Sequence, residues 1–206
     1  MLTLYYAPRT CALASHIALE EAGAEYDAVR IDFGASEQRG PDYLAINPKG
    51  RVPALVTDRG VLTETPAMLA FIAQTYPATG LAPLDDPFAF AEVQAFNSYL
   101  CSTVHVAHAH RMRGYRWADD EDAIAAMKRA VPRSVGACFE LIEQRMLRGP
   151  WVMGETYTIC DPYLFTLAQW LEVDGVDAGS IPKVIDHRRR VGERAAVTRA
   201  VAQETV

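Results

Sequence analysis

Asn47-Pro-Lys-Gly-Arg-Val-Pro-Ala-Leu-Val-Thr57 places a turn directly before a segment with the composition of a β-strand, and Pro53 stands inside that segment. Proline cannot donate a hydrogen bond to a β-ladder, so it is unusual at such a position. With the turn before it, it predicts a cis Val52-Pro53 bond that bends the end of the strand. The N–H and C=O of Val52 are then free to pair with an extended peptide ligand. The alternative is an edge-strand proline with no ligand.

The elements around this strand predict an α/β domain. Asp58-Arg59-Gly60 is typical of a hairpin turn, because turns of this kind favour Asp and Gly. From hydrophobic periodicity and residue type we expect strands over 2–6, 26–32, 51–57 and 61–63, and helices over 11–22 and 64–76, with a short helix before Asn47. The order βαβαββα favours a mixed four-stranded sheet with helices on both faces.

The composition of the chain changes after residue 77. Three prolines and a glycine occur in the run from Pro77 to Pro87, which is typical of a linker. Beyond it no strand pattern is evident, and we expect helices over 88–113, 119–147, 158–172 and 181–192. The predicted organisation is one domain over residues 1–77, a linker over 78–87 and an all-helical domain over 88–206.

Charge and hydropathy exclude several functional classes. The 206 residues are 50% hydrophobic and carry a formal net charge of −6, which does not suit a nucleic-acid surface. The densest basic run, His187 to Arg190, is typical of a solvated helix face. No segment approaches the roughly 20 apolar residues that span a bilayer, and the N-terminus lacks the basic region of a signal peptide. We therefore expect a cytoplasmic protein with no nucleic-acid or membrane partner.

Cys11 is the cysteine with a chemical context. The other three, Cys101, Cys138 and Cys160, lie in apolar helical segments, and the spacing of the four fits neither a C-x-x-C pair nor a zinc site. Cys11 follows the first strand and begins the first helix, where N–H groups and the helix dipole lower the pKa of a thiol. The alternative is a buried cysteine that caps nothing. His16 cannot serve as its base, because a spacing of five residues turns it to another face of the helix.

Glu64 and Thr65 begin a helix directly after the return strand. The Thr65 hydroxyl and the first-turn N–H groups suit an anion, and the Glu64 carboxylate suits an ammonium group. The α-amino acid end of a ligand carries both charges. The alternative is an ordinary acidic first turn.

Three histidines, His105, His108 and His110, follow the linker on one predicted helix. No acidic or cysteine ligand accompanies them nearby, so no metal is expected. One histidine facing a cleft between the domains is the preferred interpretation. Further on, Thr158-Ile-Cys-Asp161 has the pattern of a helix capping box, which indicates a role in stability and not in catalysis.

Taken together, these segments resemble the glutathione transferases, and most closely the bacterial beta class. The resemblance spans nearly the whole chain in order and spacing, and it rests on five motifs: Tyr5-Tyr-Ala-Pro-Arg-Thr-Cys-Ala-Leu-Ala-Ser-His16, Ile46-Asn-Pro-Lys-Gly-Arg-Val-Pro-Ala-Leu55, Leu62-Thr-Glu-Thr65, Ser102-Thr-Val-His105 and Thr158-Ile-Cys-Asp161.

The resemblance implies a thioredoxin-like N-terminal domain, an all-α C-terminal domain and a homodimer that serves detoxification. It implies glutathione as co-substrate, no tightly bound cofactor and a small hydrophobic electrophile as second substrate. By the same resemblance, Cys11 and His105 are catalytic residues at the glutathione sulfur. Val52 pairs with the cysteinyl backbone, and Glu64 and Thr65 hold the γ-glutamyl end. The remaining implied glutathione-binding positions are Tyr6, Arg51, Pro53 and Ser102.

The chain departs from the pattern of the class at several positions. The loop Gly34-Ala-Ser-Glu-Gln38 offers no lysine for the glycyl carboxylate of glutathione. Thr103 and Val106 stand where an acidic and a basic residue are expected, and Ser15 stands where a proline is common.

Three functions compete at this stage. The first is a transferase that activates the glutathione thiol, with thiol–disulfide exchange through Cys11 as a further activity. The second is a glutathione-dependent lyase, dehalogenase or isomerase, and the third is a non-catalytic ligand-binding module.

Overall fold

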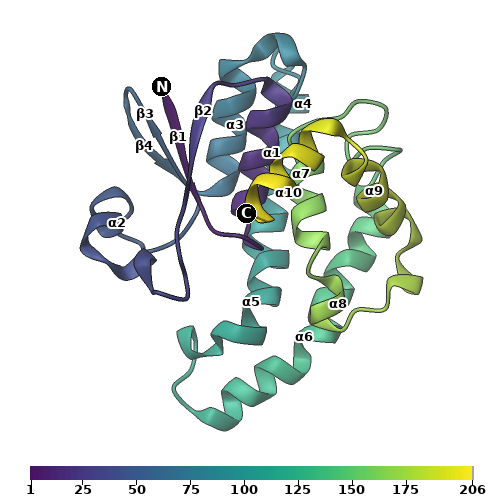
Figure 1. Cartoon of the computed structure of the whole chain (residues 1–206). Coiled ribbons are helices and arrows are strands. Elements are labelled where there is room, and N and C mark those ends of the chain that lie inside the picture. Colours follow the sequence, from purple (N-terminus) through teal and green to yellow (C-terminus); the bar gives the residue numbers. More distant parts are fainter. Residues whose placement is uncertain (206) are drawn as a thin grey trace.

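Strand β1 (Leu2–Tyr6) lies inside a four-stranded sheet in the computed structural model, which describes residues 1–205 (Figure 1). The strand order is β2-β1-β3-β4, with β2 at Tyr26–Arg30, β3 at Ala54–Thr57 and β4 at Gly60–Thr63. β1 pairs with β2 in parallel and with β3 antiparallel, and β3 and β4 form an antiparallel hairpin. The predicted fold class, a mixed α/β domain followed by a helical domain, is confirmed.

The third strand is shorter than predicted. It begins at Ala54, because Pro53 has no N–H to donate to the ladder, and residues 51–53 lie outside it. The Val52-Pro53 peptide bond is cis, as predicted. Strand β2 also ends early, at Arg30, and as the edge of the sheet it is exposed after Tyr26.

Helix α1 (Ala12–Ala22) packs between the sheet and the helical domain, against α3 (Thr65–Thr75), α7 (Cys160–Ala168) and α10 (Ala195–Thr205) (Figure 1). Its small residues Ala12, Ala14 and Ala18 are at most 1% exposed, so neighbouring elements approach the helix closely. Gly23 ends the helix in the left-handed conformation (φ 62°), as predicted for a C-terminal glycine. The turn η1 (Glu37–Arg39) and helix α2 (Pro41–Ile46) lie on the other face of the sheet, where the rings of Tyr43 and Tyr5 are 5.9 Å apart.

The remainder of the chain is helical, in line with the prediction. After the turn η2 (Pro77–Thr79), the helices are α4 (Pro87–Tyr99), α5 (His105–Arg113), α6 (Glu121–Leu141), α7 (Cys160–Ala168), α8 (Leu171–Asp174), α9 (Pro182–Gly192) and α10 (Ala195–Thr205). Short turns η4 (Gly114–Arg116) and η6 (Ala178–Ser180) and two π turns, η3 (Leu100–Val104) and η5 (Ile142–Met146), join or extend them. Within residues 1–205, no helix combines the length and apolar character needed to cross a membrane.

Two helical predictions need correction, and one further helix was not predicted. The helix expected over 88–113 is interrupted by the π turn η3, and the one expected over 158–172 is divided into α7 and α8. The last segment forms a full helix, α10, that packs against α1. There the buried His16 ring lies 2.7 Å from Gln203 Oε1 through Nε2 and 3.3 Å from Glu204 Oε1 through Nδ1. His16 is therefore a packing residue, and it does not serve as a base for Cys11.

Asp161, at the start of α7, joins three segments of the helical domain. Its carboxylate accepts hydrogen bonds from the backbone N–H of Thr158 (2.7 Å) and of Val152 (2.8 Å). Oδ1 also lies 2.9 Å from Nε2 of His187 on α9, and both side chains are fully buried. The Thr158–Asp161 contact confirms the predicted capping box, and His187 is a core residue and not part of a solvated face.

We predict that Asp161→Asn lowers the free energy of unfolding by about 3 kcal/mol, the loss typical of leaving buried hydrogen-bond donors without their acceptor. The amide keeps the volume but sets an NH₂ group against the donors that the carboxylate now satisfies. Asp186→Asn on α9 is the matched control, since Asp186 is half exposed and pairs with surface arginines; it should cost under about 1 kcal/mol. Urea unfolding of both variants measures the difference, and equal losses would contradict the role given to Asp161.

Candidate active site

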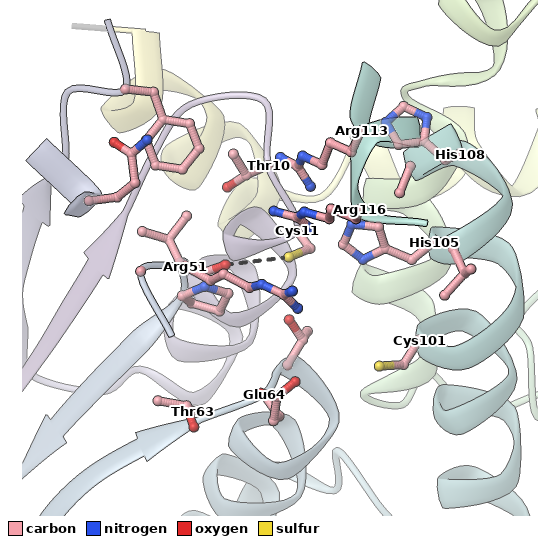
Figure 2. Close-up of a pocket in the computed structure, with 18 of the residues that line it drawn as sticks. Thr10, Cys11, Arg51, Thr63, Glu64, Cys101, His105, His108, Arg113 and Arg116 are labelled. Atoms are coloured by element: carbon pink, nitrogen blue, oxygen red, sulfur yellow. Dashed lines mark hydrogen bonds between the residues drawn. The ribbon is translucent and has the colours of Figure 1, made fainter. Parts of the chain in front are cut away.

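A cavity of about 570 Å³ opens between the N-terminal domain and the helical domain (Figure 2). One wall comes from the β1–α1 junction, the loop before β3 and the start of α3, and the other from α5, η4 and α7. We call this cavity the cleft. Seven of the residues predicted from the sequence line it: Cys11, Arg51, Val52, Pro53, Glu64, Thr65 and His105.

The Cys11 side chain is the only thiol that the N-terminal wall places in the cleft among the described residues. Cys11 precedes α1, and its Sγ donates a weak hydrogen bond to the Val52 carbonyl oxygen at 3.7 Å. The first N–H groups of the helix are already bonded elsewhere. Ala12 N–H donates to Thr10 Oγ1 (3.3 Å), and Leu13 N–H donates to the Thr10 carbonyl (3.3 Å). The thiol therefore makes no capping bond to the helix.

The predicted lowering of the Cys11 pKa is wrong. Burial raises the pKa of this thiol to about 11, and the Thr65 hydroxyl and the charge of Arg113 offset burial only in part. The N–H groups expected to stabilise a thiolate are bonded to Thr10. The position of Cys11 before the helix therefore does not lower the pKa of its thiol. Near neutral pH, Cys11 is a neutral thiol and a hydrogen-bond donor.

The loop before β3 is held firmly at the edge of the cleft. Asn47 Nδ2 (2.6 Å) and the Tyr43 hydroxyl (2.7 Å) both donate to the carbonyl oxygen of Arg51. Val52 is buried and lies outside the strand ladder. Its backbone therefore faces the cleft at a fixed place beside Cys11.

Glu64 and Thr65 sit at the start of α3, as predicted. Glu64 has a positive φ of 71°, which is uncommon for a residue with a side chain and typical of functional sites. Its carboxylate is paired with the Lys49 ammonium, which also donates to Thr63 Oγ1 at 2.8 Å. At this corner of the cleft, the Glu64 carboxylate thus already binds the Lys49 ammonium group, next to the N-terminus of α3.

The opposite wall is one face of α5 and the π turn before it. Cys101, His105, Ala109 and Arg113 follow at intervals of four residues and line the cleft. Figure 2 shows Cys101, His105 and Arg113 on the wall opposite Cys11. Burial lowers the pKa of His105 to about 4, and electrostatic interactions with His108 and with the arginines Arg113, Arg116 and Arg51 lower it further. His105 is therefore neutral near pH 7.

Trp170 and His108 form the end of the cleft. Their rings are stacked with centroids 4.2 Å apart, and the His105 ring lies 5.2 Å from Trp170. His108 Nδ1 is 2.6 Å from Asp174 Oδ2, and the same carboxylate pairs with Arg111 at 3.2 Å. This pairing occupies one nitrogen of His108. Within the described chain no three metal-ligating side chains converge.

Tyr6 and Ser102 do not reach the cleft. The Tyr6 hydroxyl donates to the Gln203 carbonyl (3.2 Å) on α10, and its ring packs against His16. Tyr6 is the last residue of β1, where side chains alternate between faces, and it points toward α1 and α10. Ser102 is exposed on η3 and donates to the Ser98 carbonyl at 2.8 Å. Neither residue lines the cleft.

Sequence reasoning missed the basic and aromatic residues of the cleft. Those not singled out beforehand include Arg39, Arg113, Arg116, Tyr163 and Trp170. A signal for Arg113 was present, since it continues the helical stripe of His105 two turns further on. Arg116, Tyr163 and Trp170 lie in separate elements that only the tertiary packing brings together.

Comparisons with known proteins agree with this geometry. A model of the glutathione S-transferase N-terminal domain matches residues 1–74. A solved glutathione transferase homologue from Sulfitobacter, with bound glutathione, is 46% identical over 100% of this chain and 99% of that chain, with a TM-score of 0.96. A beta class glutathione S-transferase from Sphingomonas chungbukensis is 32% identical over 98% of both chains (TM-score 0.85). The glutathione S-transferase GstA of Escherichia coli O157:H7 is 29% identical over 98% of both.

The chain belongs to the glutathione transferase family. The resemblance found in the sequence motifs is thereby confirmed, together with the thioredoxin-like fold of the N-terminal domain.

We predict that Cys11 reacts slowly with iodoacetamide at neutral pH. With a pKa of about 11 in place of the ordinary 9.0, its thiolate fraction is about a hundredfold lower than that of an unperturbed cysteine. The rate of alkylation of the Cys11 peptide, followed by mass spectrometry, should keep rising as the pH is raised beyond 9 toward the pKa. Alkylation of Cys101 in the same cleft is followed on a separate peptide. The Cys11→Ala variant identifies the Cys11 peptide, because its alkylation signal is then lost. A rate that levels off near neutral pH would contradict the raised pKa.

Proposed function

We propose that this protein is a glutathione transferase that activates the thiol of glutathione for attack on an electrophilic substrate. The observation that carries the proposal is the convergence of Cys11, Val52, Glu64 and Thr65 on one wall of the cleft opposite His105 on the other. A homologue 46% identical over the whole chain has glutathione bound, which supports the same ligand here.

The γ-glutamyl end of glutathione would bind where α3 begins. Its α-carboxylate suits the Thr65 hydroxyl and the N–H groups of the first turn, where the helix dipole is positive. Its ammonium suits the Glu64 carboxylate, which already accepts the ammonium of Lys49. The Glu64 carboxylate can accept a second ammonium group, because Glu64 is more than half exposed and has free acceptor positions.

The rest of the peptide would extend along the N-terminal wall. The cysteinyl backbone pairs with the backbone of Val52, which lies outside the ladder. The glycyl carboxylate then reaches Arg39 at the end of η1, one residue beyond the loop that lacks a lysine. Arg39 is exposed and pairs with no carboxylate among residues 1–205. This arginine would replace the basic residue that the sequence pattern lacks.

The sulfur of glutathione, and not that of Cys11, would carry the negative charge. Cys11 remains a thiol near neutral pH, so its S–H can donate to the thiolate of the ligand instead of to the Val52 carbonyl. Neutral His105 can donate a second hydrogen bond from the opposite wall. His105 is too weak a base to hold the thiol proton near pH 7, so the proton passes to solvent. The thiolate sulfur then forms a bond to the electrophilic carbon.

Thiol–disulfide exchange through Cys11 is a second proposed activity. It needs the Cys11 thiolate to attack a disulfide of glutathione. The raised pKa makes this species scarce near neutral pH, so exchange would be the slower reaction. The family resemblance further supports a cytoplasmic homodimer acting in detoxification, as part of the same proposal.

The test is to measure conjugation and disulfide exchange in wild type and in Cys11→Ala. Conjugation should fall by about fivefold, since removing one hydrogen-bond donor costs about 1 kcal/mol. Exchange should be abolished, because the variant lacks the Cys11 thiolate that forms the mixed disulfide with glutathione. Cys101→Ala is the matched control in the same cleft and should retain both activities.

Two outcomes would contradict this assignment. Undiminished exchange in Cys11→Ala would make Cys11 a packing residue. Complete loss of conjugation in a variant that folds normally would make Cys11 the nucleophile.

A further inference from the structure

The cleft is strongly cationic although the protein is acidic. Five arginines line it, Arg9, Arg39, Arg51, Arg113 and Arg116. Among the described residues that line the cleft, Glu64 is the sole carboxylate, and it is paired with Lys49. The chain as a whole has a formal net charge of −6. Positive charge is therefore concentrated in the cleft, where a substrate would enter.

These arginines have no carboxylate partners within residues 1–205. Elsewhere on the helical domain, Arg111, Arg148, Arg188 and Arg194 each pair with a carboxylate. The guanidinium groups in the cleft thus lack a neutralising carboxylate, whereas these four arginines elsewhere on the helical domain have one. A guanidinium fork without a partner matches the geometry of a bound carboxylate.

Three of the arginines lie close enough to repel one another. Arg113 ends α5 and Arg116 belongs to η4, and Arg51 reaches in from the opposite wall (Figure 2). Burial lowers the pKa of Arg113 first, and the charges of Arg116 and Arg51 lower it further. Cys11 also interacts electrostatically with Arg113. An anion bound here relieves the repulsion next to the reacting sulfur.

Neither carboxylate of the proposed glutathione ligand binds to Arg113 or Arg116. In the proposed placement the γ-glutamyl carboxylate binds at Thr65 and the glycyl carboxylate at Arg39, both on the N-terminal wall. Arg113 and Arg116 lie on the helical wall, beside the aromatic side chains of Tyr115, Trp117 and Trp170. This wall offers flat apolar surfaces together with two cations.

We propose that the second substrate is an anionic electrophile, a planar molecule that carries a carboxylate near its reactive carbon, and that Arg113 and Arg116 bind this carboxylate. The inference rests on the proposed function and narrows its substrate class, since the family resemblance implied only a small hydrophobic electrophile. The aromatic side chains hold the planar part of the molecule, and the arginines orient it toward the glutathione sulfur.

A matched pair of probes tests this proposal: 4-chloro-3-nitrobenzoate and its neutral methyl ester. In both, the glutathione sulfur bonds to the carbon that bears chlorine, chloride leaves with its electron pair, and the thiol proton passes to solvent. Each kcat/KM is divided by the uncatalysed rate constant, which removes the difference in intrinsic reactivity. The readout is the ratio of acid to ester.

The variants are Arg113→Gln with Arg116→Gln, and the control is Arg129→Gln on α6, which removes one exposed positive charge outside the cleft. In wild type the corrected ratio should favour the acid by at least about tenfold, and the double variant should lower that ratio roughly 10- to 100-fold, as expected when charge-assisted hydrogen bonds are lost. Any effect of the arginines on the thiolate acts on both probes and cancels in the ratio. The control should leave the ratio unchanged.

The proposal is overturned if wild type does not favour the acid, or if the double variant keeps the ratio. It is also overturned if the double variant loses affinity for glutathione while the ratio is kept, because the arginines then hold the glycyl carboxylate.

Binding of unreactive 3-nitrobenzoate, measured by calorimetry on the full chain with glutathione present, separates this proposal from the proposed function. Tight binding that weakens at least tenfold in the double variant supports the anion site, even if neither probe is turned over. Failure to turn over either probe would then count against the proposed transferase activity and not against the anion site. Equal, weak binding in both proteins overturns the anion site.

Discussion

Helix α1 is buried on every side, and this packing constraint fixes where the chemistry of the protein takes place. Its alanines let the sheet, α3, α7 and α10 approach closely, while Leu13 and Ile17 pack with Phe165 of α7 and Val191 of α9. The first helix therefore belongs to the cores of both domains. Since Cys11 precedes this helix, the thiol is held in a fixed position relative to α5, which packs against α6 and η3 on the other side of the cleft.

The same burial determines the charge state at the centre of the cleft. A thiol enclosed by protein, with the helix N–H groups already bonded to Thr10, has no means of stabilising its own negative charge. The cations around it are nevertheless unpaired, and His105 is neutral in their field. The site is therefore built for an anion that arrives with the ligand. A glutathione thiolate and a carboxylate on its reaction partner both meet this condition.

The sequence predicted the fold well because the signals were local. The βαβαββα order, the C-terminal glycine of α1, the cis Val52-Pro53 bond and the capping box at Asp161 each depend on residues a few positions apart. The π turn before His105 and the docking of α10 depend on tertiary contacts and were not predicted. At the site, motif positions brought seven residues to the cleft. Tyr6 was misplaced because its direction is set by α10, and the Cys11 pKa was misjudged because desolvation cannot be read from chain position. Arg116 and Trp170 come from turns and helices that only the packed fold brings together.

The most direct test of this account is the ultraviolet absorbance of thiolate, followed as glutathione is titrated into wild type and into Cys11→Ala near neutral pH. The account predicts no thiolate absorbance from either protein alone. On saturation, both proteins should gain about one thiolate per site, formed at lower pH than for glutathione in solution, because the cationic cleft stabilises the charge on the ligand. Thiolate absorbance in wild type before glutathione is added, and its absence from Cys11→Ala at saturation, would show that Cys11 carries the charge and would contradict the account.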